Sequence, residues 1–292
     1  MTISMFNALT IDVEDYWSIF FRDWLHIEAE PSDAVVKNTK WFLQTLGEFN
    51  IKATFFVLGE VAEKFPELVK EIACKGHEVG VHGFYHKKIF ELDSDTFKKE
   101  VGSAKKLLED ITGQKVLGHR APAFSFNADT QWALEVLAEC GFKYDSSISP
   151  AQGSRLGWPG FKKEIHRANL PSGKSILEVP MSAVSLGIVE LRVGGGYMRH
   201  FPYLYTKLAV KTIQRKRPVV LYVHPYEIDV QELALNTDNL TRKQRKRALQ
   251  FHKMQLRNRN TVGWKFTKLL NEFKFTSIRE VINSTAENEA SL

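Results

Sequence analysis

The chain has 292 residues, of which 43% are hydrophobic and 25% are charged, so it can bury a sizeable core in one large domain or two small ones. No apolar run reaches the length of about 18 residues that a membrane-spanning helix needs. The N-terminus has no basic start and no long apolar region, so we expect no secretory signal and a cytoplasmic location. Two cysteines are too few for a disulfide framework.

The net charge of +6 is modest, and much of the basic excess lies in two runs, residues 213–217 and 241–253. Runs of this kind usually form a solvated helix face. The alternative for 241–253 is contact with an anionic polymer or a membrane surface. No nucleic-acid-binding motif accompanies the charge, so we expect no nucleic-acid partner. The sequence does not indicate an oligomeric state.

Short apolar, β-branched runs alternate along the chain with longer amphipathic segments. The predicted strands are 8–13, 52–58, 77–82, 115–120, 142–147, 175–181 and 218–225. The predicted helices are 34–48, 61–75, 95–111, 128–140 and 203–216. Glycines follow three of these helices as C-caps would, and Asp93 and Asn127 precede two of them as N-caps would. This alternation predicts an α/β fold with a parallel sheet covered by helices, and about seven such units favour an irregular (β/α) barrel of about seven parallel strands.

Residues 230–292 follow a different pattern, which is helical and basic and closes on the stretch FKFTSIREVI. We therefore predict an α/β unit at 1–230 and a basic helical C-terminal extension at 231–292 that packs on the barrel. The stretch VGGGYMR (193–199) predicts a tight glycine turn near the rim, because glycine allows backbone conformations and close approaches that other residues do not.

Reactive side chains fall at the C-terminal ends of the predicted strands. In chain order they are Asp12, Glu14 and Asp15 after the first strand, His82 and His86 after the third, Arg120 after the fourth, Asp145 after the fifth and His224 after the seventh. In a parallel β/α barrel these strand ends share one rim, where catalytic groups gather. A random scatter of polar residues would not prefer these positions. We therefore expect His82 and His86 to be metal ligands rather than incidental surface residues.

The residue types predict a particular chemistry. Two imidazoles and one carboxylate leave open positions on a divalent ion, as in a catalytic site rather than a structural one. Such an ion lowers the pKa of water and polarises a carbonyl oxygen. A second carboxylate can accept a proton, an arginine beside it keeps it ionised, and a histidine across the site can donate a proton to a leaving amine. Asp12, Arg120 and His224 are available for these three roles, so the sequence predicts metal-assisted hydrolysis of an amide.

Four stretches resemble, in the right order, motifs of the polysaccharide deacetylases of the NodB-homology, carbohydrate esterase family 4 type. They are TIDVED (10–15), GHEVGVHGFYH (76–86), HRAPAFS (119–125) and YVHPYE (222–227). The resemblance covers about residues 8–230 and implies a NodB-like catalytic domain at 1–230. The tail at 256–282, together with GGGYMR, resembles a subfamily associated with exopolysaccharide biosynthesis.

The resemblance implies a role for each residue at these motif positions. Asp12 would be the catalytic base, Arg120 its partner and His224 the general acid, while His82 and His86 would be metal ligands. The implied cofactor is a divalent metal, most often Zn²⁺ and sometimes Co²⁺ or Ni²⁺. The implied substrate is an N-acetylated amino sugar.

Two positions depart from the family pattern. The family's metal-binding aspartate directly follows the base, but Val13 stands there in this chain, so the ligand is expected to be Glu14 or Asp15. Glu14 shares a face with Asp12 if the strand continues, whereas a bulge or turn would present Asp15. Gly83 stands in place of Ser or Thr, which removes a hydroxyl that could support the histidine loop.

Further residues are candidates for binding substrate. Tyr16, Trp17 and Trp158 follow strand ends or lie in loops, where aromatic rings can stack on sugars; packing in the core or in a lid is the alternative. A backbone N–H near Phe124 or Ser125 is the expected donor to a substrate oxyanion.

The leading hypothesis is a hydrolase that removes N-acetyl groups from an amino-sugar polysaccharide or its precursor. An allantoinase-like or other small-amide hydrolase is the alternative enzyme. A non-catalytic carbohydrate-binding relative would lack the base, the acid or a ligand, and none is plainly missing. A basic module that docks through 241–253 would not exclude catalysis. Because a polymer usually lies outside the cell, a cytoplasmic enzyme would act on an intermediate, such as a lipid-linked one, or be exported by another route.

Overall fold

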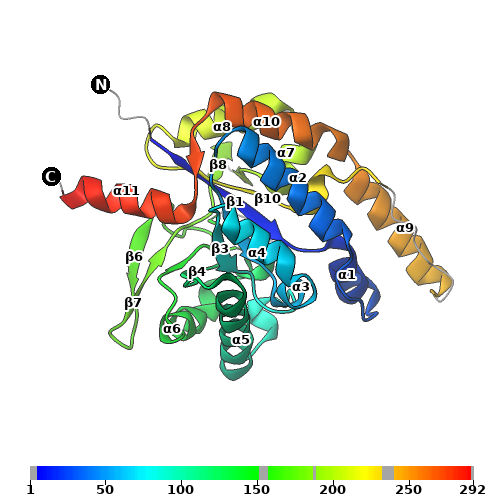
Figure 1. Cartoon of the computed structure of the whole chain (residues 1–292), viewed down its shortest axis with the longest axis horizontal. Coiled ribbons are helices and arrows are strands. Elements are labelled where there is room, and N and C mark those ends of the chain that lie inside the picture. Colours follow the sequence, from blue (N-terminus) through cyan, green and yellow to red (C-terminus); the bar gives the residue numbers. More distant parts are fainter. Residues whose placement is uncertain (1–4, 151–156, 187–188, 232–239, 291–292) are drawn as a thin grey trace.

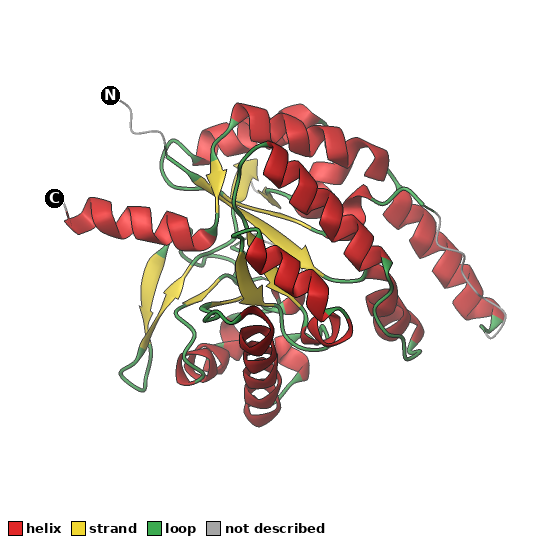
Figure 2. Cartoon of the chain, in the orientation of Figure 1, coloured by secondary structure: helices red, strands yellow, loops and turns green. Residues whose placement is uncertain are grey.

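A single curved sheet organises the protein in the computed structural model, which describes residues 5–150, 157–186, 189–231 and 240–290. The strands follow the order β10-β1-β2-β3-β4-β5-β7-β6, and β11 pairs with β1. Their bounds are β1 Asn7–Val13, β2 Thr54–Val57, β3 Glu78–Val81, β4 Gly118–His119, β5 Tyr144–Asp145, β6 His166–Asn169, β7 Ser175–Glu178, β10 Val220–Val223 and β11 Phe275–Thr276. The run from β10 to β7 is parallel, and β6 is antiparallel to β7. The prediction of seven parallel strands is confirmed, in a sheet that curls into a half-barrel with helices around it (Figures 1 and 2).

Strand β1 lies inside the sheet between β10 and β2, and all seven of its residues are buried. Leu9, Ile11 and Val13 belong to the main hydrophobic core. Because successive side chains of a strand point to opposite faces, Thr10 and Asp12 face the other, concave side of the sheet. The apolar half of β1 therefore anchors the strand, and its polar half is presented to the interior of the half-barrel.

Helices lie around the sheet (Figures 1 and 2). Their bounds are α1 Tyr16–Phe20, α2 Ala34–Glu48, α3 Gly59–Lys64, α4 Pro66–Cys74, α5 Ser94–Thr112, α6 Trp132–Glu139, α7 Gly195–His200, α8 Tyr203–Ile213, α9 Arg242–Leu256, α10 Val262–Glu272 and α11 Ile278–Ala290. The prediction of one helix at 61–75 is wrong, because Pro66 lacks an N–H group and begins a new helix instead. The predicted cap at Asp93 is confirmed, since its Oδ1 accepts from the Thr96 N–H at 2.7 Å. None of the described helices is both long and apolar enough to cross a membrane.

The segment between β7 and β10 contains structure that the sequence pattern did not predict. A hairpin of β8 (Ala183–Leu186) and β9 (Val189–Arg192) precedes α7. The predicted glycine turn is the start of α7, and Gly194 has a φ of +119°. A Cβ atom at Gly194 would lie 2.2 Å from the carbonyl oxygen of Tyr222, so only glycine allows this segment to lie against β10.

The C-terminal region is joined to the sheet as well as to the helices. The expected helices are present as α9, α10 and α11, and β11 adds a short parallel pairing with β1 at Asn7 and Ala8. Phe266 of α10 packs edge-on against Phe42 of α2, with ring centroids 5.0 Å apart. Residues 232–239, at the start of the predicted extension, lie outside the described residues. The division of the chain at residue 230 stays a prediction.

Replacing Phe266 by alanine should lower the free energy of unfolding by about 3–5 kcal/mol, because the buried ring leaves a cavity between α10 and α2. Urea unfolding followed by circular dichroism measures the change. The matched control is Trp264→Ala on the same helix, whose side chain is 50% exposed. Equal destabilisation by both variants would contradict a core that includes α10.

Candidate metal and acid–base site

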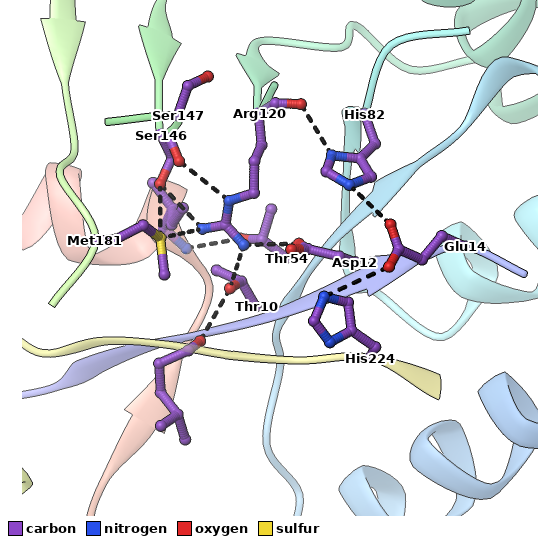
Figure 3. Close-up of polar contacts among 12 residues, drawn as sticks. Thr10, Asp12, Glu14, Thr54, His82, Arg120, Ser146, Ser147, Met181 and His224 are labelled. Atoms are coloured by element: carbon purple, nitrogen blue, oxygen red, sulfur yellow. Dashed lines mark hydrogen bonds and ion pairs between the residues drawn. The ribbon is translucent and has the colours of Figure 1, made fainter. Parts of the chain in front are cut away.

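Arg120 and Asp12 form a fully buried ion pair at the centre of the concave face. The Arg120 Nη1 donates to Asp12 Oδ1 at 2.7 Å and to Thr10 Oγ1 at 2.6 Å. Its Nε donates to the Ser146 carbonyl at 3.1 Å, and its Nη2 to Ser146 Oγ at 3.0 Å (Figure 3). The guanidinium also lies 4.3 Å from the centre of the Phe56 ring. These contacts fix the orientation of the Asp12 carboxylate, which lines the cavity above it.

Glu14 lies on the same face as Asp12, and two histidines converge on it. Its Oε2 is 3.3 Å from His82 Nε2 and 3.0 Å from His86 Nε2. The ligand atoms of this buried triad lie within 4.8 Å of one another. Tetrahedral ligands at zinc bond lengths are separated by about 3.3 Å. The side chains of Glu14, His82 and His86 therefore fit a divalent metal ion.

The second ring nitrogen of His82 fixes its tautomer. His82 Nδ1 lies 2.9 Å from the backbone carbonyl of Arg120, which can only accept a hydrogen bond (Figure 3). The proton is therefore on Nδ1, and the lone pair of Nε2 faces Glu14 and is free for a metal. Arg120 thus orients both Asp12 through its side chain and His82 through its backbone.

The loop between the histidines is held by backbone contacts. Gly83 has a φ of +77°, a left-handed conformation that Ser or Thr would adopt only with strain. Its carbonyl accepts from the Gly59 N–H at 3.0 Å, and the Phe84 carbonyl accepts from the Glu60 N–H at 3.1 Å. Gly83 has no hydroxyl to support the loop, and backbone N–H groups in the first turn of α3 hold the loop instead.

The two alternatives for the acidic ligand occupy different places. Asp15 is the N-cap of α1, where its Oδ2 accepts from the Ser18 N–H at 2.9 Å and its Oδ1 from the Ser32 hydroxyl at 2.8 Å. Both of its oxygens are therefore engaged in starting the helix. Glu14 is the carboxylate that lies with His82 and His86.

His224 approaches the triad from β10, on the other side of β1. Its Nε2 is 3.5 Å from Glu14 Oε1 (Figure 3). Its Nδ1 is 3.5 Å from Glu227 Oε2. Burial alone would lower the pKa of His224, but the carboxylates of Glu14, Glu227 and Asp12 outweigh it and raise the pKa to about 9. For Glu14, burial alone would raise the pKa, but the surrounding imidazoles hold it well below its usual value.

Asp145, at the end of β5, does not reach Arg120. Its Oδ1 lies 2.7 Å from His119 Nδ1 and accepts from the Ser147 hydroxyl at 2.6 Å. Its Oδ2 accepts from the Ser147 N–H at 2.8 Å, as in a loop cap. Asp145 therefore supports the backbone under the site.

A cavity of about 490 Å³ opens above these residues. Its lining residues are Asp12, Glu14, Tyr16, Ile19, Phe20, Asp23, Trp24, His82, His86, Lys88, Ala123, Phe124, Arg192, Tyr222, His224, Tyr226, Phe251 and Gln255. It thus joins the predicted base, acid and ligands to an aromatic wall. Helix α1 and the distant helix α9, which carries the basic run 241–253, both contribute to that wall.

The predicted substrate-binding residues divide into two groups. Tyr16 and Phe124 line the cavity, although Tyr16 also packs deeply among the aromatic rings of α1 and α9. Trp17 stacks edge-on with Phe21 at 4.7 Å, and Trp158 packs on Phe161 at 4.8 Å. Neither Trp17 nor Trp158 lines the cavity, and packing explains both rings.

Ser125 also lies away from the cavity. It is fully buried, and its hydroxyl accepts from the Ile89 N–H at 3.1 Å. The backbone N–H groups of Phe124 and Ser125 donate to the carbonyls of Ala121 and Pro122, each at 3.2 Å. Both amides are thus used by the turn itself, so either could bind a substrate oxygen only if that turn opened.

The sequence reasoning missed much of the cavity wall. Trp24 and Phe251, with ring centroids 4.4 Å apart, meet across more than two hundred residues. Arg192 reaches the cavity from the unpredicted strand β9. The sequence signal that could have pointed to Trp24 is the group of aromatic residues that follows the first predicted strand. No local pattern singles out Phe251 or Arg192.

Residues 24–144 match the sequence family described as Polysaccharide deacetylase, and residues 146–283 match a domain of unknown function, DUF3473. Residues 24–144 are therefore similar in sequence to a polysaccharide deacetylase domain. His82, His86 and Arg120 lie in the deacetylase match, whereas His224 lies in the DUF3473 match. Asp12 and Glu14 precede both. The site is therefore assembled from three parts of the sequence.

Curated relatives share parts of the sequence. A peptidoglycan-N-acetylglucosamine deacetylase of Bacillus cereus is 39% identical over 75 residues, which are 26% of this chain and 27% of the relative. A chitooligosaccharide deacetylase of Rhizobium leguminosarum bv. trifolii is 31% identical over 120 residues, which are 41% of this chain and 54% of the relative. The chain thus spans between about a quarter and just over half of the length of these relatives.

Solved structures share the fold. A Mycobacterium smegmatis protein assigned to the polysaccharide deacetylases is 24% identical with a TM-score of 0.56, over 75% of this chain and 76% of that one. The peptidoglycan deacetylase PdaC of Bacillus subtilis is 14% identical with a TM-score of 0.50, over 99% of this chain and 95% of that one. At these identities the likeness is one of fold.

Replacing Glu14 by glutamine should weaken Zn²⁺ binding by more than about 100-fold, because loss of a supporting residue alone typically costs 10–100-fold and Glu14 is placed as a ligand. Competition with a chromophoric chelator measures the affinity. The neighbouring variant Asp15→Asn is the matched control and should leave Zn²⁺ affinity within about threefold, since asparagine also caps helices. Similar losses in both variants would contradict the assignment of Glu14.

Proposed function

We propose that this protein is a metal-dependent hydrolase that removes N-acetyl groups from an amino-sugar polysaccharide or its biosynthetic intermediate. One observation carries the proposal: two carboxylates at the C-terminal end of β1, Asp12 within the strand and Glu14 just after it, have different partners. Asp12 is held by Arg120, and Glu14 by a pair of histidines. A metal ligand and a proton acceptor thus lie side by side in one cavity.

Glu14, His82 and His86 would hold the metal, and their donor set of two imidazoles and one carboxylate suits Zn²⁺, with Co²⁺ or Ni²⁺ as alternatives. When bound there, the ion would supply Lewis-acid polarisation of the acetamide carbonyl and lower the pKa of water. The tautomer imposed on His82 by the Arg120 carbonyl prepares its Nε2 for this role.

Asp12 would act as the general base. Its carboxylate faces the cavity, and the Arg120 guanidinium keeps it oriented through a 2.7 Å hydrogen bond. His224 would act as the general acid, because it lines the same cavity and approaches from β10, on the opposite side of Glu14 from His82. Proton transfer to the leaving amine from that side would complete cleavage of the amide.

The aromatic lining supports a sugar substrate over a small cyclic amide. Trp24, which is 51% exposed, and Phe251 form one wall, and Tyr226 stacks at 4.9 Å on the acid His224. Flat apolar faces beside polar groups suit the rings of a saccharide. The paired base and the intact ligand triad speak against a decayed, non-catalytic site. The proposal includes a substrate from exopolysaccharide biosynthesis, because residues 256–282 resemble a subfamily associated with that process.

Chelation should abolish the proposed activity. Acetate release from N-acetylated chito-oligosaccharides, measured by a coupled assay, is expected to fall below about 1% after treatment with a chelator, since the ion activates both water and carbonyl. Added Zn²⁺ or Co²⁺ should restore it. Hydrolysis of small cyclic amides alone, unaffected by chelator, would favour the allantoinase-like alternative.

The variant Asp12→Asn should lower kcat by about 10²–10⁴-fold, because an amide cannot accept the proton of the attacking water. The same acetate assay measures the rate, and Zn²⁺ affinity should be retained since Asp12 is not a member of the metal triad. Asp110→Asn, a change at a side chain on α5 that is 62% exposed, is the control for loss of a carboxylate. Full activity of the Asp12 variant would refute the proposed base.

A further inference from the structure

We propose that Arg192 binds a carboxylate or phosphate group of the substrate, so that the preferred substrate is an acidic acetamido saccharide. This inference rests on the proposed function and adds the chemical class of the saccharide. It is carried by a cation that lines the active-site cavity and has no anionic partner among the described residues.

Arg192 is held firmly at its base. It ends β9, where it pairs with Ala183 of β8, and its carbonyl accepts from the Tyr205 hydroxyl at 2.9 Å. Its Nε donates to Ser149 Oγ at 2.8 Å. The guanidinium carbon lies 5.5 Å from the centre of the Phe124 ring. The planar head group is therefore oriented before any ligand arrives.

The two terminal nitrogens of Arg192 have no hydrogen bond or ion pair within the part of the chain that the structure describes. Two other arginines near the site are paired, Arg120 with Asp12 and Arg22 with Glu60. A partly buried guanidinium without a counter-ion has lost hydration and gained no compensating charge. A carboxylate or phosphate matches its two free nitrogens in a bidentate fork.

Lys88 provides a comparison inside the same cavity. Its ammonium is 3.1 Å from Glu91 Oε1 and 3.5 Å from Asp23 Oδ2, so its charge is already neutralised by the protein. Of the lysine and arginine side chains that line the cavity, Lys88 is thus compensated by the protein and Arg192 is not. Arg192 is therefore the arginine or lysine of this cavity that remains without an anionic partner in the described part of the chain.

The position of Arg192 suits recognition of a group near the reacting acetamide. The ring of Phe124 lies 5.5 Å from the guanidinium carbon of Arg120 and 5.5 Å from that of Arg192. The two guanidinium groups are therefore within twice that distance, which one or two sugar residues can span. An anion on the same sugar as the acetamido group, or on its neighbour, could reach Arg192.

The charge of α9 supports an anionic substrate. This helix contributes Phe251 and Gln255 to the cavity wall, and no acidic residue occurs from 241 to 259. On this helix and at the residue that caps its C-terminal end, the exposed cations without an ion pair among the described residues are Arg242, Lys243, Lys246, Arg247, Lys253 and Arg257. Such a field attracts anions toward the cavity.

The test compares kcat/KM for two tetrasaccharides, one of alternating N-acetylglucosamine and glucuronate and one of N-acetylglucosamine alone. The wild type should prefer the acidic one, and Arg192→Gln should reduce that preference about tenfold to a hundredfold, as expected for hydrogen bonds to a charged group. Arg192→Lys should be intermediate because it keeps the charge and loses the fork. Lys88→Gln is the matched control and should leave the ratio within about twofold. Competition by N-acetylglucosamine 1-phosphate distinguishes phosphate from carboxylate recognition.

Binding of the acidic tetrasaccharide to the zinc-loaded Asp12→Asn protein, measured by calorimetry, separates this inference from the proposed function. One outcome is that the wild-type protein hydrolyses neither saccharide while the Asp12→Asn, Arg192→Gln double variant binds the acidic tetrasaccharide at least tenfold more weakly than Asp12→Asn alone. That result would support the anion site and refute the proposed activity. If acetate is released without any preference for the acidic saccharide, the anion site is refuted and the activity stands. An equal loss of kcat/KM on both tetrasaccharides in Arg192→Gln would also refute the anion site, because Arg192 would then act only by packing on Phe124 and binding Ser149.

Discussion

The buried guanidinium of Arg120 connects the two halves of the site. A fully buried cation is tolerated only when its charge and its hydrogen bonds are satisfied, and Arg120 is satisfied by Asp12, Thr10 and Ser146. The same residue orients His82 through its backbone carbonyl. The proton acceptor and the metal ligands are thereby tied to one residue, which directly follows β4. A change in the packing around Arg120 would shift both together.

The alternation of side chains along β1 decides what Arg120 can meet. Leu9, Ile11 and Val13 pack into the main core, so their burial fixes the rotation of the strand. Asp12 and Glu14 then point together to the concave face, beside His82 at the end of β3 and His224 at the end of β10. A slip of one residue would send both carboxylates into the hydrophobic core. Core packing and site geometry are therefore consequences of the same strand register.

The strand-end residues form the floor of the cavity, and its walls come from a loop, two helices and a hairpin. The histidine loop is supported by backbone hydrogen bonds from α3, α1 begins at the Asp15 cap, and α9 packs its rings on those of α1. The hairpin of β8 and β9 adds Arg192, in the part of the chain that matches DUF3473. The floor thus carries the proposed amide chemistry, and the walls supply the features that would distinguish one saccharide from another.

The sequence by itself determined the seven parallel strands, most helix positions and the placement of reactive residues at strand ends, because periodicity and capping are local properties. The sequence did not decide whether Glu14 or Asp15 is the expected metal ligand. The direction of the chain after Val13 depends on Ser18 and Ser32, which bind Asp15 as a helix cap. The sequence did not reveal Phe251 or Arg192 as cavity residues, because each acquires its place from partners remote in the chain, Trp24 in one case and Phe124 in the other. Only the tertiary structure decided these, since a contact between distant segments is set by how packed elements meet and leaves no trace in local pattern.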